Sequence, residues 1–253
     1  MKIGLLIPCT SNGRQWKNIK ESYLYKLSIK TFLLTANIEH DYKFYIGIDK
    51  NDIIFDNKDN QKIIYDLKKI FKNIDYEFIV MNDIKKGHLT KMWNILFQKA
   101  YDENFDYFFQ CGDDINFKTK GWVNDCIKTL QNNNNIGLTG PINNNSRILT
   151  QAFVSRKHME IFGWFFPEEI INWCCDDWYN WVYQPKHFFP LRNHFCSNEG
   201  GKPRYIINDN ESFLINQTEA NKNLTLLRQN TFELANNHKE QIKKYLFDCN
   251  NFC

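Results

Sequence analysis

The chain has 253 residues, a formal net charge of +3 and 43% hydrophobic residues. This length can bury the core of one large domain, or of one domain with a C-terminal appendage. The net charge is too small to indicate nucleic acid as a partner. Apolar runs stay well below the roughly 20 residues that cross a bilayer, so we expect no membrane span.

The cysteine pattern indicates the cellular compartment. The eight cysteines show no Cys-x-x-Cys spacing, and the neighbours Cys174 and Cys175 cannot easily form a disulfide with each other. The apolar stretch 3–7 is too short for a secretion signal. We therefore expect reduced thiols and a cytoplasmic location.

In the first half of the chain, short apolar runs alternate with helical patterns. The expected strands are residues 3–7, 44–48, 76–81 and 106–111, and the expected helices are residues 22–35, 62–72 and 90–101. Strands that alternate with helices of about a dozen residues indicate βαβ units. We therefore predict an α/β fold, with a mostly parallel sheet flanked by helices.

The second half is less regular. Helices are expected at residues 121–130, 156–162 and 173–183, and strands at 136–140 and 149–154. Residues 186–210 are rich in His, Pro, Gly and Asn and are expected to be irregular. Residues 219–248 suggest two terminal helices. We divide the chain into a domain of residues 1–215 and a helical extension of residues 216–253 that packs on it.

Polar residues follow three of the first four predicted strands, in the loop 10–14, at Asp49 and at Gly112-Asp113-Asp114. Ligands of parallel α/β sheets bind outside the carboxyl ends of the strands. Adjacent carboxylates such as Asp113 and Asp114 can hold Mg²⁺ or Mn²⁺ while a phosphate supplies further oxygens. Gly-Asp-Asp is also good turn chemistry, so a metal site and a polar turn both remain open at this point.

A second pair of acids, Asp176 and Asp177, opens the helix that is expected to end at residue 183. Asp176 is a favourable N-cap, which explains one carboxylate without any function. Asp177 lies in the first turn, where the helix dipole favours its ionised form. An ionised carboxylate that faces the cleft can act as a general base. Aromatic residues nearby can stack on a sugar, although most aromatic residues belong to a core.

A third stretch is basic and contains histidines. His194 or His187 can complete a metal shell, and Arg192, Lys202 and Arg204 can neutralise a diphosphate. The alternative is a solvated basic loop. The sequence carries no P-loop, no dinucleotide glycine pattern, no Gly-x-Ser-x-Gly and no zinc-type cluster.

Together, the three stretches resemble the nucleotide-sugar glycosyltransferases of the GT-A fold. Residues 107–115 look like the hydrophobic strand and the Asp-x-Asp motif of that family, with Gly112 at the position of the first acid. The last acid is the surest metal ligand of the family, which implies that Asp114 binds the metal. Asp113 is then assigned to the donor, and Mn²⁺ or Mg²⁺ is the implied cofactor.

Residues 176–178 are similar to the Glu-Asp motif of inverting family members. The resemblance implies that Asp177 deprotonates the acceptor hydroxyl. Residues 162–164 and 192–205 look like the aromatic-glycine segment and the His-containing metal loop of the β-1,4-galactosyltransferases. That match favours His194 over His187 as a metal ligand. Arg192, in the same loop, is assigned to the donor as a residue that can neutralise the diphosphate.

The first two strand ends also match the family, and the resemblance as a whole spans about residues 1–205. Asp49 matches the acid that contacts the nucleobase or ribose. Pro8 and Thr10 match the first nucleotide loop, to which we add Arg14. The implied partners are a nucleotide-sugar donor, expected to be UDP-linked, and a carbohydrate or glycoconjugate acceptor.

The expected function is therefore metal-dependent, inverting transfer of a hexose from a UDP-sugar to an acceptor hydroxyl. Two alternatives remain. The loop 11–14 faintly resembles the N-terminal loop of sugar-phosphate nucleotidyltransferases. The glycine at position 112, in place of an acid, is compatible with a non-catalytic carbohydrate-binding protein on a degenerate glycosyltransferase scaffold.

Overall fold

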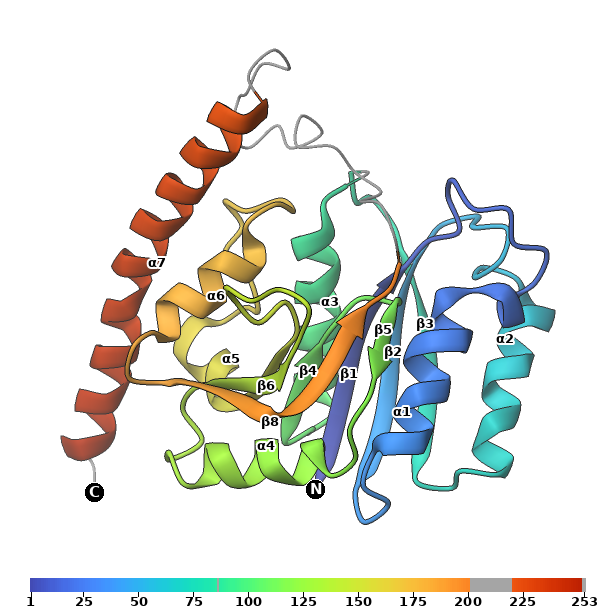
Figure 1. The fold of residues 1–253 in the computed structure, drawn as a ribbon, viewed down its shortest axis with the longest axis horizontal. Helices are drawn as coiled ribbons and strands as arrows, with labels where there is room; N and C mark the ends of the chain where they lie inside the picture. The colour runs from blue at the N-terminus through green and yellow to red at the C-terminus, as the bar shows by residue number, and fades with distance from the viewer. Residues whose placement is uncertain (86, 201–219, 252–253) are drawn as a thin grey trace.

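The structure is a computed structural model that describes residues 1–85, 87–200 and 220–251 (Figure 1). Within this part of the chain, eight strands form one curled sheet in the order β3-β2-β1-β4-β7-β6-β8-β5. Their bounds are β1 Lys2–Cys9, β2 Asp41–Asp49, β3 Ile74–Met81, β4 Tyr107–Gln110, β5 Ile115–Phe117, β6 Leu138–Ile142, β7 Ala152–Ser155 and β8 Phe188–Asn198.

The sheet is mostly parallel, as the alternating pattern predicted. Strands β1 to β4 run parallel to one another, and β6 runs parallel to β8. Strands β5 and β7 are antiparallel to their neighbours. Every residue of β1 after Lys2 is buried, as expected for a parallel strand that is covered on both faces.

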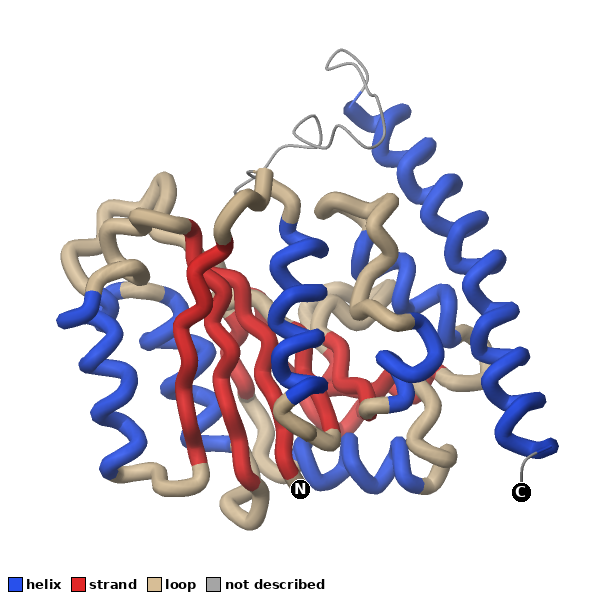
Figure 2. Tube along the Cα trace, turned by 180° about the vertical axis from the view of Figure 1, so that it is seen from behind, coloured by secondary structure: helices blue, strands red, loops and turns tan. Residues whose placement is uncertain are grey.

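Helices cover both faces of the sheet. Helices α1 and α2 lie on one face and α3 on the other (Figures 1 and 2). The α-helices are α1 Lys30–Thr35, α2 Lys58–Tyr65, α3 Leu89–Asp102, α4 Trp122–Gln131, α5 Lys157–Phe162, α6 Cys175–Tyr183 and α7 Ala220–Asn251. A π-helix, Leu24–Ile29, precedes α1, and two short 3₁₀ helices are Ile19–Glu21 and Asp66–Lys69.

The side chains of β1 alternate between two cores because successive strand residues point to opposite faces. Leu5 and Ile7 join the core beneath α1, α2 and α4. Leu6 joins the core beneath α3, α5 and α6. In that second core the Phe97 ring meets the Phe108 ring edge-on, with centroids 4.6 Å apart. The carboxyl ends of the strands are left at one rim of the two cores.

Two expectations about helices need correction. The helix expected over residues 22–35 is wound as a π-helix in its first part, Leu24–Ile29, and as α1 only from residue 30. The two helices expected over residues 219–248 are one helix, α7, of 32 residues. Its sequence contains no glycine or proline that would end a helix. None of the described helices has both the length and the apolar character needed to cross a membrane.

Residues 186–210 were expected to be irregular, but the structure places the 11-residue strand β8 in their first half. Its hydrogen-bond partners are β6 and β5, which are distant in sequence. Such non-local pairing leaves little trace in the local pattern. The domain boundary after residue 215 lies outside the described residues, so the division at that point stays a prediction.

Candidate active site

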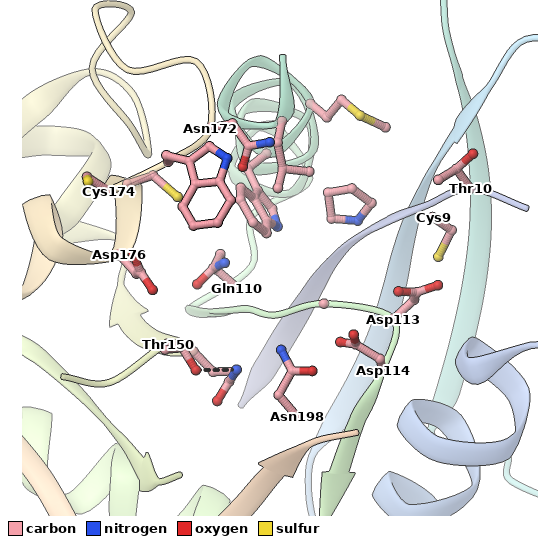
Figure 3. Close-up of a pocket in the computed structure, with 18 of the residues that line it drawn as sticks. Cys9, Thr10, Gln110, Asp113, Asp114, Thr150, Asn172, Cys174, Asp176 and Asn198 are labelled. Atoms are coloured by element: carbon pink, nitrogen blue, oxygen red, sulfur yellow. Dashed lines mark hydrogen bonds between the residues drawn. The ribbon is translucent and has the colours of Figure 1, made fainter. Parts of the chain in front are cut away.

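A cavity of about 360 Å³ lies at the carboxyl ends of β1, β2 and β4 (Figure 3). This is the edge at which ligands of parallel α/β sheets bind. The structure therefore brings together side chains from three strand ends that are distant in sequence. Six of the residues predicted for the donor and the metal line this cavity: Pro8, Thr10, Arg14, Asp49, Asp113 and Asp114.

The loop after β1 is held in place by Asp52, which the sequence analysis missed. The Asp52 carboxylate accepts hydrogen bonds from the Ser11 backbone N–H at 2.6 Å and from the Ser11 hydroxyl at 2.8 Å. It also accepts from the backbone N–H groups of Ile54 and Phe55. An Asp that bonds to backbone groups two and three residues ahead is a recognisable turn signal, and here it also fixes the donor loop.

Arg14 follows this loop, and its guanidinium contacts Gly200 and Tyr23. It donates a hydrogen bond from Nη2 to the Gly200 carbonyl at 3.3 Å. Its guanidinium carbon lies 4.9 Å from the centre of the Tyr23 ring, within cation–π distance. These contacts hold a positive charge at the end of the cavity where Asp113 and Asp114 lie.

The turn that carries Asp113 and Asp114 is held by a buried serine of the π-helix. The Ser28 hydroxyl donates to the Gly112 carbonyl at 3.3 Å and accepts from the Ile115 N–H at 3.1 Å. Ser28 therefore spans the turn from its first residue to the start of β5. The sequence analysis did not identify it, because a serine inside an apolar helical pattern carries no signal of its own.

Glycines at positions 112 and 200 leave room for the Asp114 carboxylate. A Cβ at position 112 would lie 2.6 Å from Asp114 Oδ1, and a Cβ at position 200 would lie 1.8 Å from Oδ2. Both distances are too short for real contacts, so neither position accepts a larger residue with Asp114 in this place. Gly112, which occupies the position of the first acid, therefore has a packing reason of its own.

The adjacent carboxylates of Asp113 and Asp114 fit a hard divalent cation by their chemistry. Mg²⁺ prefers oxygen ligands and is commonly held by one or two carboxylates together with substrate phosphates. Among the described residues, no group of three or more His, Cys, Asp or Glu side chains is arranged to hold a metal. A cation at Asp113 and Asp114 would thus need oxygens from a bound ligand.

The structure does not bring His194 or Arg192 to this cavity. His194 is buried on β8, with Nε2 2.7 Å from the Asp125 carboxylate and Nδ1 3.1 Å from the Thr119 hydroxyl. The hydrogen bond with His194 lowers the pKa of Asp125. Arg192 is exposed on the same strand and does not line the cavity. Residues 202–204 lie outside the described part of the chain.

The two acids of α6 point to different surroundings. Asp176 lines the cavity, and Figure 3 shows its carboxylate directed toward the centre. Asp177 does not line the cavity, and its buried carboxylate forms an ion pair with the exposed Arg147. Burial and, second, the charge of Asp177 raise the pKa of Asp176 to about 6. A carboxylate with a pKa near neutrality and access to a cavity is suited to proton transfer.

The cysteines at the start of α6 also line the cavity. Burial raises the pKa of the Cys174 thiol to about 12, and it raises that of Cys175 well above the usual value. Because the thiolate is the nucleophilic form, both thiols are poor nucleophiles at neutral pH. The arrangement favours proton transfer by Asp176 over covalent catalysis by cysteine.

No protein-family model matches the chain, and no curated protein sequence matches it either. Solved structures with a similar fold do match the structure of this chain. The mostly parallel sheet flanked by helices is consistent with a GT-A-like fold, as the sequence resemblance implied.

Solved structures of TarS from S. aureus, a glycosyltransferase, share this fold. TarS 1–349 in complex with UDP-GlcNAc matches with a TM-score of 0.56 at 10% identity, over 94% of this chain and 70% of that chain. A second structure of TarS 1–349 gives 0.52 at 12% identity, over 77% and 60%. A longer TarS chain gives 0.52 at 11% identity over 77% of this chain, which spans only 36% of that one.

Proposed function

We propose that this chain is a glycosyltransferase that moves a hexose from a UDP-sugar to an acceptor hydroxyl with inversion. The observation that carries this proposal is one cavity that holds the adjacent acids Asp113 and Asp114 together with Asp176. The fold shared with TarS, which was solved in complex with UDP-GlcNAc, supports a nucleotide sugar as the donor.

The donor would lie across the strand ends. Thr10 and Asp49, at the ends of β1 and β2, would contact the nucleoside, and the Arg14 guanidinium would neutralise phosphate charge. Asp113 and Asp114 would hold Mn²⁺ or Mg²⁺. When bound, such a cation would offset the charge of the diphosphate leaving group.

We assign the general base to Asp176, whereas the resemblance to inverting family members implies Asp177. Asp177 is paired with Arg147, whereas Asp176 faces the cavity with a pKa near neutrality. Asp176 would take the proton of the acceptor hydroxyl as its oxygen bonds to the anomeric carbon. The bond from that carbon to the diphosphate breaks, its electron pair leaves with UDP, and the anomeric configuration inverts.

A thermal-shift panel of UDP-sugars, each with and without Mn²⁺, tests donor binding. A ligand that binds only the folded state raises Tm with its saturation, so we expect at least one UDP-sugar, with UDP-GlcNAc as the first candidate, to do so. UDP release in the presence of an acceptor mixture then tests transfer. If no nucleotide sugar raises Tm, the proposal is wrong. Pyrophosphate release from a nucleoside triphosphate and a sugar phosphate would indicate a nucleotidyltransferase instead.

The variant Asp176→Asn tests the base. We expect it to lower turnover by at least 100-fold, a typical size for loss of a general base, and to leave the UDP-sugar shift in Tm unchanged. The neighbouring variant Asp177→Asn is the matched comparison. If only Asp177→Asn abolishes turnover, Asp177 is the base, as the sequence resemblance implies, and the assignment to Asp176 is wrong. Binding with no turnover in the unmodified protein across donors and acceptors would favour the non-catalytic alternative.

A further inference from the structure

Gln110, the last residue of β4, has a buried side-chain amide whose oxygen lacks a hydrogen-bond partner among the described residues. Only 2% of the residue is exposed, and its side chain lines the cavity. The buried Oε1 atom has no hydrogen-bond partner among the described residues. An unpaired buried carbonyl oxygen destabilises a fold, so such a group in a cavity wall calls for a partner that arrives with a ligand.

A second glutamine that lines the same cavity, Gln151, has hydrogen-bond partners at both ends of its amide. A position in this cavity wall therefore does not by itself leave a glutamine oxygen without a partner. Gln151 donates from Nε2 to the Thr150 hydroxyl at 2.7 Å, the dashed contact in Figure 3, and its Oε1 accepts from the Cys196 thiol at 3.3 Å. Both ends of the Gln151 amide are thus engaged within the protein. The Gln110 carbonyl oxygen, in a residue that lines the same cavity, has no such partner among the described residues.

The position of Gln110 in the cavity indicates which part of a bound ligand would supply the missing hydrogen-bond donor. Figure 3 shows its amide between the Asp176 carboxylate on one side and the carboxylates of Asp113 and Asp114 on the other. In the proposed reaction the diphosphate lies at Asp113 and Asp114, and the attacked carbon lies between it and the base. The ring of the transferred sugar must therefore occupy the space in front of Gln110.

We propose that Gln110 is a specificity-determining residue that accepts a hydrogen bond from a hydroxyl or amide N–H of the transferred sugar. The inference rests on the proposed function, because it needs a nucleotide sugar in this cavity. A carbonyl oxygen accepts from O–H and N–H groups and offers nothing to an alkyl group. A site built to bond a polar group discriminates strongly against ligands that lack it.

The test compares Gln110→Leu with the unmodified protein by calorimetric titration, using UDP and the UDP-sugar that binds most tightly in the thermal-shift panel. Leucine nearly keeps the volume and removes the amide. We expect UDP to bind both proteins within twofold. For the UDP-sugar, we expect the dissociation constant of Gln110→Leu to be at least tenfold higher. Without ligand, Gln110→Leu should melt about 2–4 °C higher, because an unpaired buried oxygen is gone.

Gln61→Leu is the matched control. Gln61 is also buried, but it lies on α2 and donates to the Phe55 carbonyl at 2.8 Å, so its loss should lower Tm and leave the ratio of the two dissociation constants unchanged. If Gln110→Leu binds UDP normally and its ratio of the two dissociation constants equals that of the unmodified protein, Gln110 does not bond the sugar. The proposed donor site is unaffected by that result. If the unmodified protein binds neither ligand, the proposed function falls and this inference falls with it.

Discussion

At the scale of single residues, the partly buried position of Asp176 in the cavity wall destabilises the fold as well as serving the proposed reaction. Its pKa is raised from 3.8 to about 6, which corresponds to roughly 3 kcal/mol of folding free energy against the ionised form. Between these two pH values the folded state holds a proton that the unfolded chain has already lost. Stability therefore falls as the pH rises through this window.

Asp176→Asn removes this effect of pH. We expect the variant to be more stable than the unmodified protein by roughly 3 kcal/mol at pH 8, and about equally stable at pH 4. Urea unfolding of both proteins at the two pH values measures the difference. An unchanged difference between pH 4 and pH 8 would show that Asp176 does not carry the raised pKa. In the unmodified protein, transfer should rise with pH and level off above about pH 7.

The sequence could predict that an acid at the start of α6 faces the site, but not which one. Cys174 precedes the helix with φ of 68°, a left-handed conformation that is uncommon for a residue other than glycine. That conformation sets where the helix begins, and the helix start decides which of Asp176 and Asp177 points into the cavity. No pattern in the sequence signals it.

The direction of the His194 side chain could not be predicted from the sequence for a similar reason. The pairing of β8 with β6 is interrupted between Leu191 and Phe195, which face the adjacent residues Pro141 and Ile142. In a regular strand, alternation decides which side chains share a face, and a shift of one residue reverses them. An irregularity that contains Arg192 and His194 therefore makes their directions unpredictable from spacing, and a motif match cannot replace that information.

At the scale of elements, the strand ends were predictable because hydrophobic runs and their polar termini are local signals. The contact between the π-helix and the turn at residues 112–115 is not local. Ser28 contributes one hydroxyl to two backbone groups of that turn. A second hydroxyl, that of Thr31, accepts from the Phe117 N–H at 2.9 Å. Two side chains of one helical segment thus fix both ends of the segment that follows β4.

We expect Ser28→Ala to destabilise the protein by about 1–3 kcal/mol, because it leaves the buried Ile115 N–H without its partner. It should also weaken UDP binding in the presence of Mn²⁺ by about tenfold, since the turn with Asp113 and Asp114 loses its support. Urea unfolding and calorimetric titration measure the two effects.

Thr31→Val serves as the matched variant, because it removes a hydroxyl from the far end of the same segment. It should lower stability to a similar extent and leave UDP binding within twofold. Equal losses of UDP binding in the two variants would mean that the hydroxyls support the fold generally and have no special role at the turn.

Helix α7 packs along α6 (Figure 1), and a side-chain hydrogen bond between described residues joins the two helices. The Trp178 indole donates to Nδ1 of His238 at 3.1 Å. Burial lowers the pKa of His238, so the folded state prefers the neutral ring that can accept this bond. The contribution is complete above the usual histidine pKa and is lost as the pH falls through the lowered value.

Acid should therefore loosen α7 in the unmodified protein more than in His238→Phe, which has no ring nitrogen to protonate. Hydrogen exchange of the α7 amides at pH 5 and pH 8, corrected for the intrinsic rates, measures this loosening. We expect the unmodified protein to lose more protection than His238→Phe between the two values. The same loss in both proteins would assign the pH effect to another group.

At the scale of the whole molecule, α7 completes the second core. Leu227, Ala235 and Ile242 of α7 are buried, and the last two belong to the core that also contains Trp178. A chain that ends at residue 219 should be less stable by roughly 3 kcal/mol or more, on the usual contribution of buried aliphatic side chains. Thermal unfolding of the two chains measures the difference. Equal stability would mean that the extension is independent of the domain.

The π-helix has a consequence for any change in the length of this chain. Residues 24–29 carry a wider turn than an α-helix, and such turns arise where one residue has been added to a helix. Removing the exposed Lys26 would let the segment wind as a regular α-helix and would rotate one side of it against the other by about 100°. Ser28 and Thr31 both follow Lys26, so they would rotate together relative to residues 24 and 25, and either those residues or the two hydroxyls would lose their present contacts. The number of residues in the π-helix before α1 is therefore constrained by the contacts of Ser28 and Thr31 with residues 112–117.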